Sequence, residues 1–462
     1  MIHSHPVRDQ GPVRVALTGA NGGYGRTLLA QLQRTPELIP TALVDPDVEG
    51  IRRTLGELGG DARFAVATTG DEFREAVADG GIALLRDAAA LDWSEVDVLV
   101  EGTGQVRVGT AYAEEALANG THVVMVSKEV DTVSGVALAA KAEAAGLRYL
   151  PGDGDQPANL LRMVDWISAV GLDIVAIGKS GEYDLVFDPA TGTVEHAGVT
   201  IEAPGLAELL DLGAEPRSTL SRRAELVAGL KRAAAADLCE MTVVAMRTGA
   251  APDAEGLHYP VARIAELADV YAAHEDGGIL RRDGVVDVFS ALRLPGEASF
   301  AGGVFAVVRT GDPVTWEMLR AKGHVISRDG KYACLYWPYH AMGVETPLTI
   351  HAAASGTGSS PRPRPTTLLA ARAVTALEPG TPFRVTGHHH EIDGVSPVMV
   401  APDAAIAPYY LLGDAQLRRS VGAGELVRLD DLEHLAPEPL AAYTAGTSAP
   451  SVRRGPTPGA GE

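Results

Sequence analysis

The sequence predicts an α/β protein with three parts: a Rossmann-type parallel sheet domain, a second α+β domain and a small β-rich C-terminal domain. Short apolar runs alternate with longer amphipathic segments from residue 12 to about residue 150, which is the pattern of β-α-β units. A glycine-rich turn follows the first apolar run. The chain has 462 residues, more than the roughly 250–300 that a single core supports.

Composition shifts divide the chain further. The last stretch is small, polar and rich in Pro and Gly, so we expect it to be a frayed tail. Within the second domain we expect a helical stretch over 221–248 and strands such as GVVDVFSALRL and GGVFAVVRT. The expected parts are a dinucleotide-binding domain (12–150), a mixed second domain (151–354), a Ser/Gly/Pro linker (355–365), a β-rich module (366–436) and the tail (437–462).

Charge and cysteine content exclude several classes of protein. The formal net charge of −21 argues against binding to nucleic acid or to an anionic membrane surface. Two cysteines, Cys239 and Cys334, cannot build a disulfide framework or a multi-cysteine zinc site. The beginning of the chain has no signal-peptide pattern and 18 apolar residues nowhere run together, so we expect a cytoplasmic protein. Buried apolar faces in the second domain favour a homo-oligomer.

The glycine-rich turn has the spacing of a dinucleotide site. Gly19, Gly22 and Gly25 lie between an apolar strand and a helix, where backbone N–H groups can approach a pyrophosphate. Asp45 ends the next strand and would accept hydrogen bonds from the adenosine ribose, which favours NAD, although Arg52 and Arg53 leave NADP open. A glycine-rich turn in a nucleotide-free domain is the alternative. The candidate cofactor residues are Gly19, Asn21, Gly22, Gly23, Tyr24, Gly25, Asp45, Gly102, Thr103, Gly104 and Ser127.

Two charged groups follow strands that end at the same edge of the sheet. Lys128 ends the run VMVSK in a chain with only six lysines, and it could bind a carbonyl or phosphate, or donate a proton if burial lowers its pKa. Pairing with Glu129 or Asp131 is the structural alternative. Asp155 and Gln156, in the turn GDGDQP, could cap the next helix or orient a substrate.

A second lysine, Lys179, ends the apolar run DIVAIGK. Glu240 lies in the apolar helical stretch AAADLCEMTVVAM, where an ionised carboxylate needs a partner, and Lys179 is suited to that role. The pair could be catalytic or purely structural.

The segment YACLYWPYHAMGVE gathers aromatic side chains around His340 in a chain that is only 5% aromatic. Such a cluster could form an amphipathic pocket wall, with His340 exchanging a proton near neutral pH, or an aromatic core patch. The run His388–His390 lies in the β-rich module, and we expect no metal site there or elsewhere, because consecutive residues of a strand point different ways.

Nearly the whole chain resembles a known family: NAD(P)-dependent oxidoreductases with a homoserine-dehydrogenase-like core and a C-terminal SAF domain. The motifs that carry the resemblance are VALTGANGGYG, VEGTG, HVVMVSKEVD, GDGDQPANLLRMVDW, VAIGKSGEY, CEMTVVAMRTG, YWPYHAMGVE and the SAF-like AVTALEPGTPF and YLLGDAQLRRSVGAGELVRLDDL. The resemblance implies that six residues line the cleft: Lys128, Asp155, Gln156, Lys179, Glu240 and His340.

Some relatives in this family are deoxyxylulose-phosphate reductoisomerases, which use NADPH and a divalent metal. This chain has Trp337 where those relatives have an arginine before Pro-Tyr-His, and an alanine run ending at Ala236 where they have Asp-Gly-Thr-Lys. Both departures remove cations that would bind a phosphate dianion.

We therefore predict an NAD(P)-dependent oxidoreductase that transfers a hydride between the nicotinamide and a carbonyl or hydroxyl carbon of a small polar metabolite. In this hypothesis Lys128 polarises the substrate oxygen, Lys179 or His340 exchanges the proton, and Asp155 and Glu240 orient these groups. The alternatives are a sugar-phosphate reductoisomerase, which would need a divalent metal, and a catalytically weakened dinucleotide sensor or scaffold.

Overall fold

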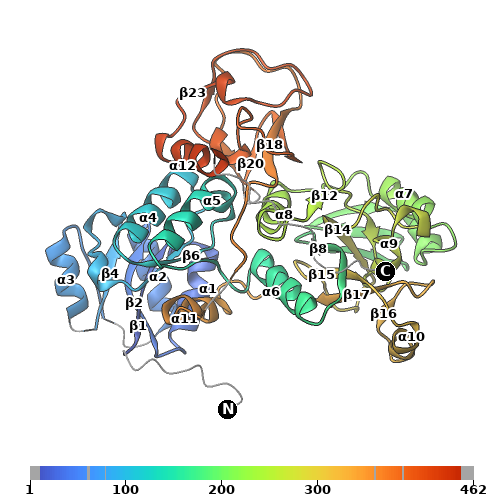
Figure 1. Cartoon of the computed structure of the whole chain (residues 1–462), viewed down its shortest axis with the longest axis horizontal. Helices are drawn as coiled ribbons and strands as arrows, with labels where there is room; N and C mark the ends of the chain where they lie inside the picture. Colours follow the sequence, from blue (N-terminus) through green and yellow to red (C-terminus); the bar gives the residue numbers. More distant parts are fainter. Residues whose placement is uncertain (1–10, 60–62, 79, 358–359, 388–389, 449–462) are drawn as a thin grey trace, which may run out of the picture.

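A computed structural model describes residues 11–59, 63–78, 80–357, 360–387 and 390–448 (Figure 1). The first domain is a seven-stranded sheet, in the order β3-β4-β2-β1-β5-β6-β7, in which every strand pair is parallel. Its strands are β1 (Val13–Thr18), β2 (Leu38–Val44), β3 (Phe64–Val66), β4 (Ile82–Leu85), β5 (Val98–Glu101), β6 (His122–Met125) and β7 (Tyr149–Pro151). The prediction of a Rossmann-type parallel sheet is confirmed.

Helices connect these strands: α1 (Gly23–Leu32), α2 (Val48–Leu58), α3 (Gly70–Ala78), α4 (Val106–Ala118) and α5 (Lys128–Ala144). The strand order reverses at β1, which pairs with β2 on one side and β5 on the other. Ligands of open parallel sheets bind in the crevice beyond the carboxyl ends of the strands at such a reversal. The glycine-rich turn lies at this point.

One helix returns to the first domain from far along the chain. α11 (Thr346–Ser355) packs beside α1 and β6, and its Ile350 and Ala353 belong to the same apolar cluster as Val15 and Leu28 (Figure 1). The end of the expected second domain therefore packs with the first. Because this contact joins segments more than 300 residues apart, local periodicity does not reveal it.

The second domain is built on a mixed sheet in the order β11-β10-β9-β14-β8-β15-β17-β16, with β12 and β13 also paired to β14. Its strands are β8 (Asp173–Ser180), β9 (Leu185–Asp188), β10 (Thr193–His196), β11 (Val199–Glu202), β12 (Ala251–Pro252), β13 (Val261–Ala262), β14 (Val285–Arg293), β15 (Val304–Arg309), β16 (Val325–Ile326) and β17 (Tyr332–Trp337). Its helices are α6 (Gln156–Ala169), α7 (Pro216–Leu226), α8 (Ala235–Thr248), α9 (Leu267–Val270) and α10 (Pro313–Ala321). This mixture confirms the predicted α+β domain.

The predicted helical stretch 221–248 is interrupted between α7 and α8. There the Lys231 carbonyl lies 3.1 Å from His196 Nε2, and Arg232 Nη1 donates to the Tyr259 carbonyl at 2.8 Å. Hydrogen bonds to other parts of the second domain replace helical hydrogen bonds over this segment. The local sequence pattern does not predict this interruption.

The C-terminal module is mostly β, as predicted. Its strands are β18 (Leu368–Ala373), β19 (Val385–Thr386), β20 (Glu391–Ile392), β21 (Val395–Val400), β22 (Gln416–Leu417) and β23 (Leu432–Glu433), each paired antiparallel within the module. Its core is continuous with that of the second domain, because Leu369 and Met399 lie in one apolar cluster with Met241 and Val244 of α8.

The first part of the expected tail (437–462) is instead a packed helix, α12 (Pro437–Ser448), which lies against α5 (Figure 1). Tyr443 is buried and its hydroxyl donates to the Ile406 carbonyl at 3.2 Å. A Cβ added at Gly446 would lie 3.0 Å from Val136 Cβ, so the small residues that resemble a linker serve a close helix contact. Residues 449–462 lie outside the described part of the chain.

Within the described residues no helix is long and apolar enough to cross a membrane. Both cysteines, Cys239 and Cys334, are buried and unpaired.

Candidate active site

The loop between β1 and α1 approaches the loop after β5 so closely that only glycine fits. Gly19 has φ +68°, and a Cβ there would lie 2.2 Å from the Gly102 carbonyl oxygen. A Cβ at Gly25 would lie 2.5 Å from the Ala20 carbonyl oxygen, whereas one at Gly23 would meet no atom within 4 Å. The loop is therefore tightly packed against backbone at Gly19 and Gly25 and has open space beside Gly23.

The first turn of α1 is left free of side-chain caps. Its N-cap residue is Gly22, which has no side chain to accept the helical N–H groups. Uncapped N–H groups at a helix start bind phosphate oxygens, so this geometry fits the pyrophosphate of a dinucleotide. Tyr24 is the second residue of this turn, and its hydroxyl contacts the Thr346 hydroxyl of α11.

Asp45 is fixed at the rim of the same loop. Its carboxylate accepts the backbone N–H of Asn21 at 3.1 Å and that of Asp47 at 2.9 Å. These bonds hold a half-buried carboxylate at the end of β2, where the ribose of a bound dinucleotide would lie.

The loop after β5 is organised by a buried carboxylate that sequence reasoning did not single out. Glu101 is fully buried, and its Oε1 accepts from Thr103 Oγ1 at 2.6 Å and from the Thr103 N–H at 3.0 Å. The Gly104 N–H donates to Ser127 Oγ at 2.7 Å. Burial raises the pKa of Glu101 despite these hydrogen bonds. A carboxylate ending an otherwise apolar strand is the signal that could have identified it.

Lys128 is the first residue of α5, three positions beyond the end of β6. A cation at a helix start is opposed by the helix dipole by about 0.3–1 kcal/mol. Here two carboxylates offset that cost, since Lys128 Nζ lies 2.9 Å from Glu240 Oε1 and 3.2 Å from Asp155 Oδ2. Burial disfavours the charge, but the two carboxylates outweigh it and raise the pKa of Lys128. The hypothesis of an ammonium with a lowered pKa is therefore wrong.

Glu240 connects Lys128 to the second lysine. Its Oε2 contacts Lys179 Nζ, so the predicted pairing of these two residues is confirmed. Burial opposes the ionisation of Glu240, yet the two ammonium groups lower its pKa to about 2. The carboxylate thus stays ionised between two cations.

The charged chain continues inward from Lys179. Lys179 Nζ donates to Asp237 Oδ1 at 2.7 Å, and Tyr259 OH donates to Asp237 Oδ2 at 3.0 Å. Burial raises the pKa of Asp237, although Lys179 opposes that shift. Asp237 lies one helical turn before Glu240, and that spacing of two carboxylates in an alanine-rich helix is the signal that sequence reasoning missed.

His340 lies beside this network. A Cβ added at Gly302 would lie 2.2 Å from His340 Nδ1 and 3.2 Å from Gln156 Nε2, so the imidazole and the amide both pack over that glycine. Burial lowers the pKa of His340, which favours the neutral imidazole. The Gln156 Oε1 atom is buried with no hydrogen-bond partner among the described residues. Asp155 caps α6 through the Gln156 N–H at 3.0 Å, as one of its two predicted roles required.

The aromatic segment is a surface wall and not a core patch. Tyr336 and Tyr339 are 45% and 55% exposed, and the guanidinium of Arg162 lies 5.2 Å from the centre of the Trp337 ring. The Arg162 Nη1 atom also lies 3.3 Å from Glu345 Oε2. The alternative of an aromatic core is wrong for the two tyrosines.

The two acidic neighbours of Lys128 pair elsewhere. Glu129 contacts His390 of the C-terminal module, and Asp131 lies 3.0 Å from Arg247 Nη2. The alternative in which Lys128 pairs with either of them is therefore wrong. His388 and His389 lie outside the described residues.

Two family models match the chain. Residues 22–151 match the NAD-binding domain of homoserine dehydrogenase, and residues 154–346 match the catalytic domain described as oxidoreductase DRL. Among curated proteins, none matches the chain.

Solved structures of oxidoreductases match the chain at low identity and low TM-score. UDP-N-acetylglucosamine 3-dehydrogenase GnnA from Acidithiobacillus ferrooxidans is 13% identical, with 76% of this chain and 91% of that chain covered and a TM-score of 0.37. GenD2 from gentamicin A biosynthesis, in complex with NAD, is 18% identical, with 78% and 91% covered and a TM-score of 0.34. A DOX-P reductoisomerase with fosmidomycin and magnesium is 20% identical, with 37% of this chain covered and a TM-score of 0.27; the chain spans 46% of its length.

The parallel sheet and the glycine-rich loop define a Rossmann-type domain, and the two matched models both describe parts of oxidoreductases. Within that class, the chain combines an NAD-binding domain like that of homoserine dehydrogenase with a catalytic domain like that of oxidoreductase DRL.

Proposed function

We propose that the protein is an NAD(P)-dependent oxidoreductase that transfers a hydride between the nicotinamide and a carbonyl or hydroxyl carbon of a small polar metabolite. The position of Lys128 carries the proposal, because its side chain is 21% exposed. The side chains of the other four members of the charged network are only 2–6% exposed; these members are Asp155, Glu240, Lys179 and Asp237. An ammonium has three N–H donors, and two carboxylates take up two directions. The third is left for a substrate oxygen.

The nicotinamide, when bound, supplies or accepts the hydride. Lys128 donates its free N–H to the reacting oxygen and stabilises negative charge there. Asp155 and Glu240 hold the ammonium in place. In the oxidising direction the neutral imidazole of His340 accepts the proton of the substrate hydroxyl, and in the reducing direction the imidazolium of His340 returns that proton to the oxygen. Lys179 is enclosed by Asp237 and Glu240 and is better suited to positioning Glu240.

We infer that NAD is preferred to NADP. The carboxylate of Asp45 at the loop rim would bind the two ribose hydroxyls and repel a 2′-phosphate. Arg53 is exposed and its Nη2 lies 3.2 Å from Asp47, so it is already paired with a carboxylate beside that position.

The site offers a poor ligand set for a divalent metal. Asp155 and Glu240 both engage Lys128, and no cluster of three or more His, Cys, Asp or Glu side chains able to hold a metal occurs among the described residues. In the reductoisomerase alternative these carboxylates would have to exchange their contact with Lys128 for a metal ion. In our proposal the group that polarises the substrate oxygen is therefore Lys128.

A small-molecule substrate and a second copy of the chain are the partners we propose. Large apolar side chains on α6 and in the segment after β17 stay exposed, including Trp166 (54%) and Tyr339 (55%), which supports a homo-oligomer. Light scattering on a sizing column would give the molar mass, and a monomer at micromolar concentration would refute this part.

The activity is tested with 4-deuterated NADH and NADPH against a panel of ketones and aldehydes, screened first for ligands that raise the melting temperature only with cofactor present. We expect deuterium in the alcohol product of at least one compound. Tight NADH binding with no turnover of any compound would instead support a dinucleotide sensor, and binding of neither cofactor would refute both.

A further inference from the structure

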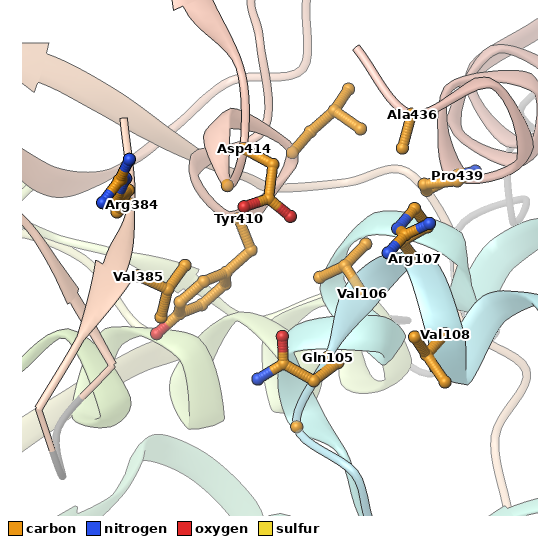
Figure 2. Close-up of a pocket in the computed structure, with 13 residues that line it drawn as sticks. Gln105, Val106, Arg107, Val108, Arg384, Val385, Tyr410, Asp414, Ala436 and Pro439 are labelled. Carbon is orange, nitrogen blue, oxygen red and sulfur yellow. The ribbon is translucent and has the colours of Figure 1, made fainter. Parts of the chain in front are cut away.

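The C-terminal module meets the first domain at the loop that follows β5. Figure 2 shows Arg384 and Val385, the latter in β19, on one side of a pocket of about 210 Å³, with Gln105 and Val106 at the start of α4 facing them. Gly104 lines the same pocket. β19 pairs with β20, so this two-stranded sheet lies beside the loop that holds Gly104.

His390, the residue before β20, makes the closest approach to that loop. A Cβ at Gly104 would lie 3.1 Å from His390 Cε1, so the imidazole packs directly on the Gly104 backbone. His390 Nδ1 contacts the Glu129 carboxylate, whose side chain is only 5% exposed. His390 has φ +51°, a left-handed backbone conformation that residues other than glycine rarely adopt.

Both neighbouring parts of the protein hold this strand in place. The Ile392 N–H donates to Tyr409 OH at 2.8 Å inside the module. Glu391 pairs with Lys231, which lies between α7 and α8 of the second domain. The position of His390 is therefore fixed from two sides, and its ring reaches a third part of the chain.

We propose that His390 is a positioning residue of the cofactor site, through which the C-terminal module covers the Gly102–Gly104 loop and holds Glu129 away from Lys128. This inference rests on the proposed function. It gives the C-terminal module a defined task, which is to complete the wall of the dinucleotide site.

The charges around His390 explain why a histidine suits this place. Glu129 faces His390 from α5, where Lys128 is the preceding residue, while Glu391 follows His390 on β20 and is paired with Lys231. The Glu129 contact raises the pKa of His390, although burial and Lys128 oppose the shift. A protonated His390 neutralises the buried Glu129 carboxylate, which leaves Lys128 to Asp155 and Glu240.

The test compares His390→Phe and His390→Gln with the matched control His434→Phe. His434 lies in the same module and also has a left-handed φ of +64°, but its side chain is 69% exposed and lies beside the neighbouring Glu433. Binding of NADH and of NADPH is measured by fluorescence titration from pH 6 to 9 on full-length protein, with a thermal melt to confirm folding. We expect His390→Phe to weaken NADH binding about threefold to tenfold, the range expected for one lost hydrogen bond, and the control to bind as the wild type does.

The pH dependence separates positioning from mere packing. Because the protonated form makes the contact, wild-type affinity should fall as the pH rises through the pKa of His390, and His390→Gln should bind with little dependence on pH. Unchanged affinity and pH dependence in both His390 variants would overturn this inference alone. A wild-type protein that binds neither cofactor would overturn it together with the proposed function.

Discussion

Lys128 Nζ and Glu240 Oε1 lie 2.9 Å apart, and this contact joins the first residue of α5 in the NAD-binding domain to the middle of α8 in the second domain. Glu240 then contacts Lys179 through its other oxygen. The two domains therefore share one buried charged network. Replacing any of its members is expected to alter contacts in both domains.

Replacing Lys128 with Met should reduce kcat by about a hundredfold to a thousandfold, the usual cost of removing one donor to a developing oxyanion. Binding of NADH should persist, because no contact of the glycine-rich loop is lost. The matched control is Lys141→Met on the same helix, where the lysine is 53% exposed and pairs with Glu114. Equal turnover of the two variants would remove Lys128 from the mechanism.

Replacing Glu240 with Gln should destabilise the fold, because Lys128 and Lys179 both lose a buried partner. Since the folded pKa of Glu240 is about 2, against an ordinary 4.5, its ionisation contributes on the order of 3 kcal/mol at neutral pH. That contribution is complete above pH 4.5 and is lost as the pH falls towards 2. Urea unfolding should therefore show a steeper loss between pH 4.5 and 2.5 in the wild type than in the variant.

The same experiment has a surface control. Glu49→Gln removes an exposed i,i+3 pair with Arg52, and such pairs contribute roughly 0–1 kcal/mol. A loss of stability in Glu240→Gln no larger than in this control would contradict the buried network.

Replacing Gly302 with Ala should lower kcat while cofactor affinity stays near the wild-type value. The new methyl group would lie 2.2 Å from His340 Nδ1, so the imidazole must move. Gly302 also has φ +71°, which strains alanine, and Gly296→Ala controls for this because Gly296 has φ +83° with no atom within 4 Å of its Cβ position. Equal kcat in the two variants would show that the position of His340 is unimportant.

The activity should depend on the neutral form of His340. Burial lowers the pKa of this imidazole, so the direction of reaction that needs a proton acceptor should lose its rate only at a pH below the ordinary pKa of histidine. A profile of kcat/KM against pH measures this, and His340→Asn should abolish the acidic limb. An acidic limb that survives in His340→Asn would assign the proton transfer to another group.

Local patterns predicted the parts of the site that depend on neighbouring residues. The alternation of strands and helices around Gly19 and Asp45 gave the parallel sheet, and an ionised Glu240 in an apolar helix required a cation, which proved to be Lys179. Both inferences follow from periodicity and from the cost of burying charge.

Contacts between distant segments were not predictable in this way. α11 returns to α1 across more than 300 residues, and His390 reaches Glu129 across 261. α12 looked like a tail because its small residues, such as Gly446, have the composition of a linker, yet their size is what allows the helix to approach Val136. Composition and periodicity carry no information on which distant surface a segment will cover.

Cofactor preference gives the last prediction. Asp45 accepts hydrogen bonds from the Asn21 and Asp47 N–H groups, and in our proposal its carboxylate lies beside the adenosine ribose. Asp45→Asn keeps an oxygen that can accept one of these bonds but removes the charge that repels a 2′-phosphate. The ratio of kcat/KM for NADH to that for NADPH should fall about tenfold or more. Repulsion between like charges near a protein surface is worth up to several kcal/mol, and the loss of only about 1.4 kcal/mol of it changes the ratio by a factor of ten. The exposed Asp71→Asn serves as the control for a general change in charge. If Asp45→Asn leaves the ratio unchanged, the preference must come from elsewhere in the loop, and Arg53, which pairs with Asp47, would be the next residue to replace.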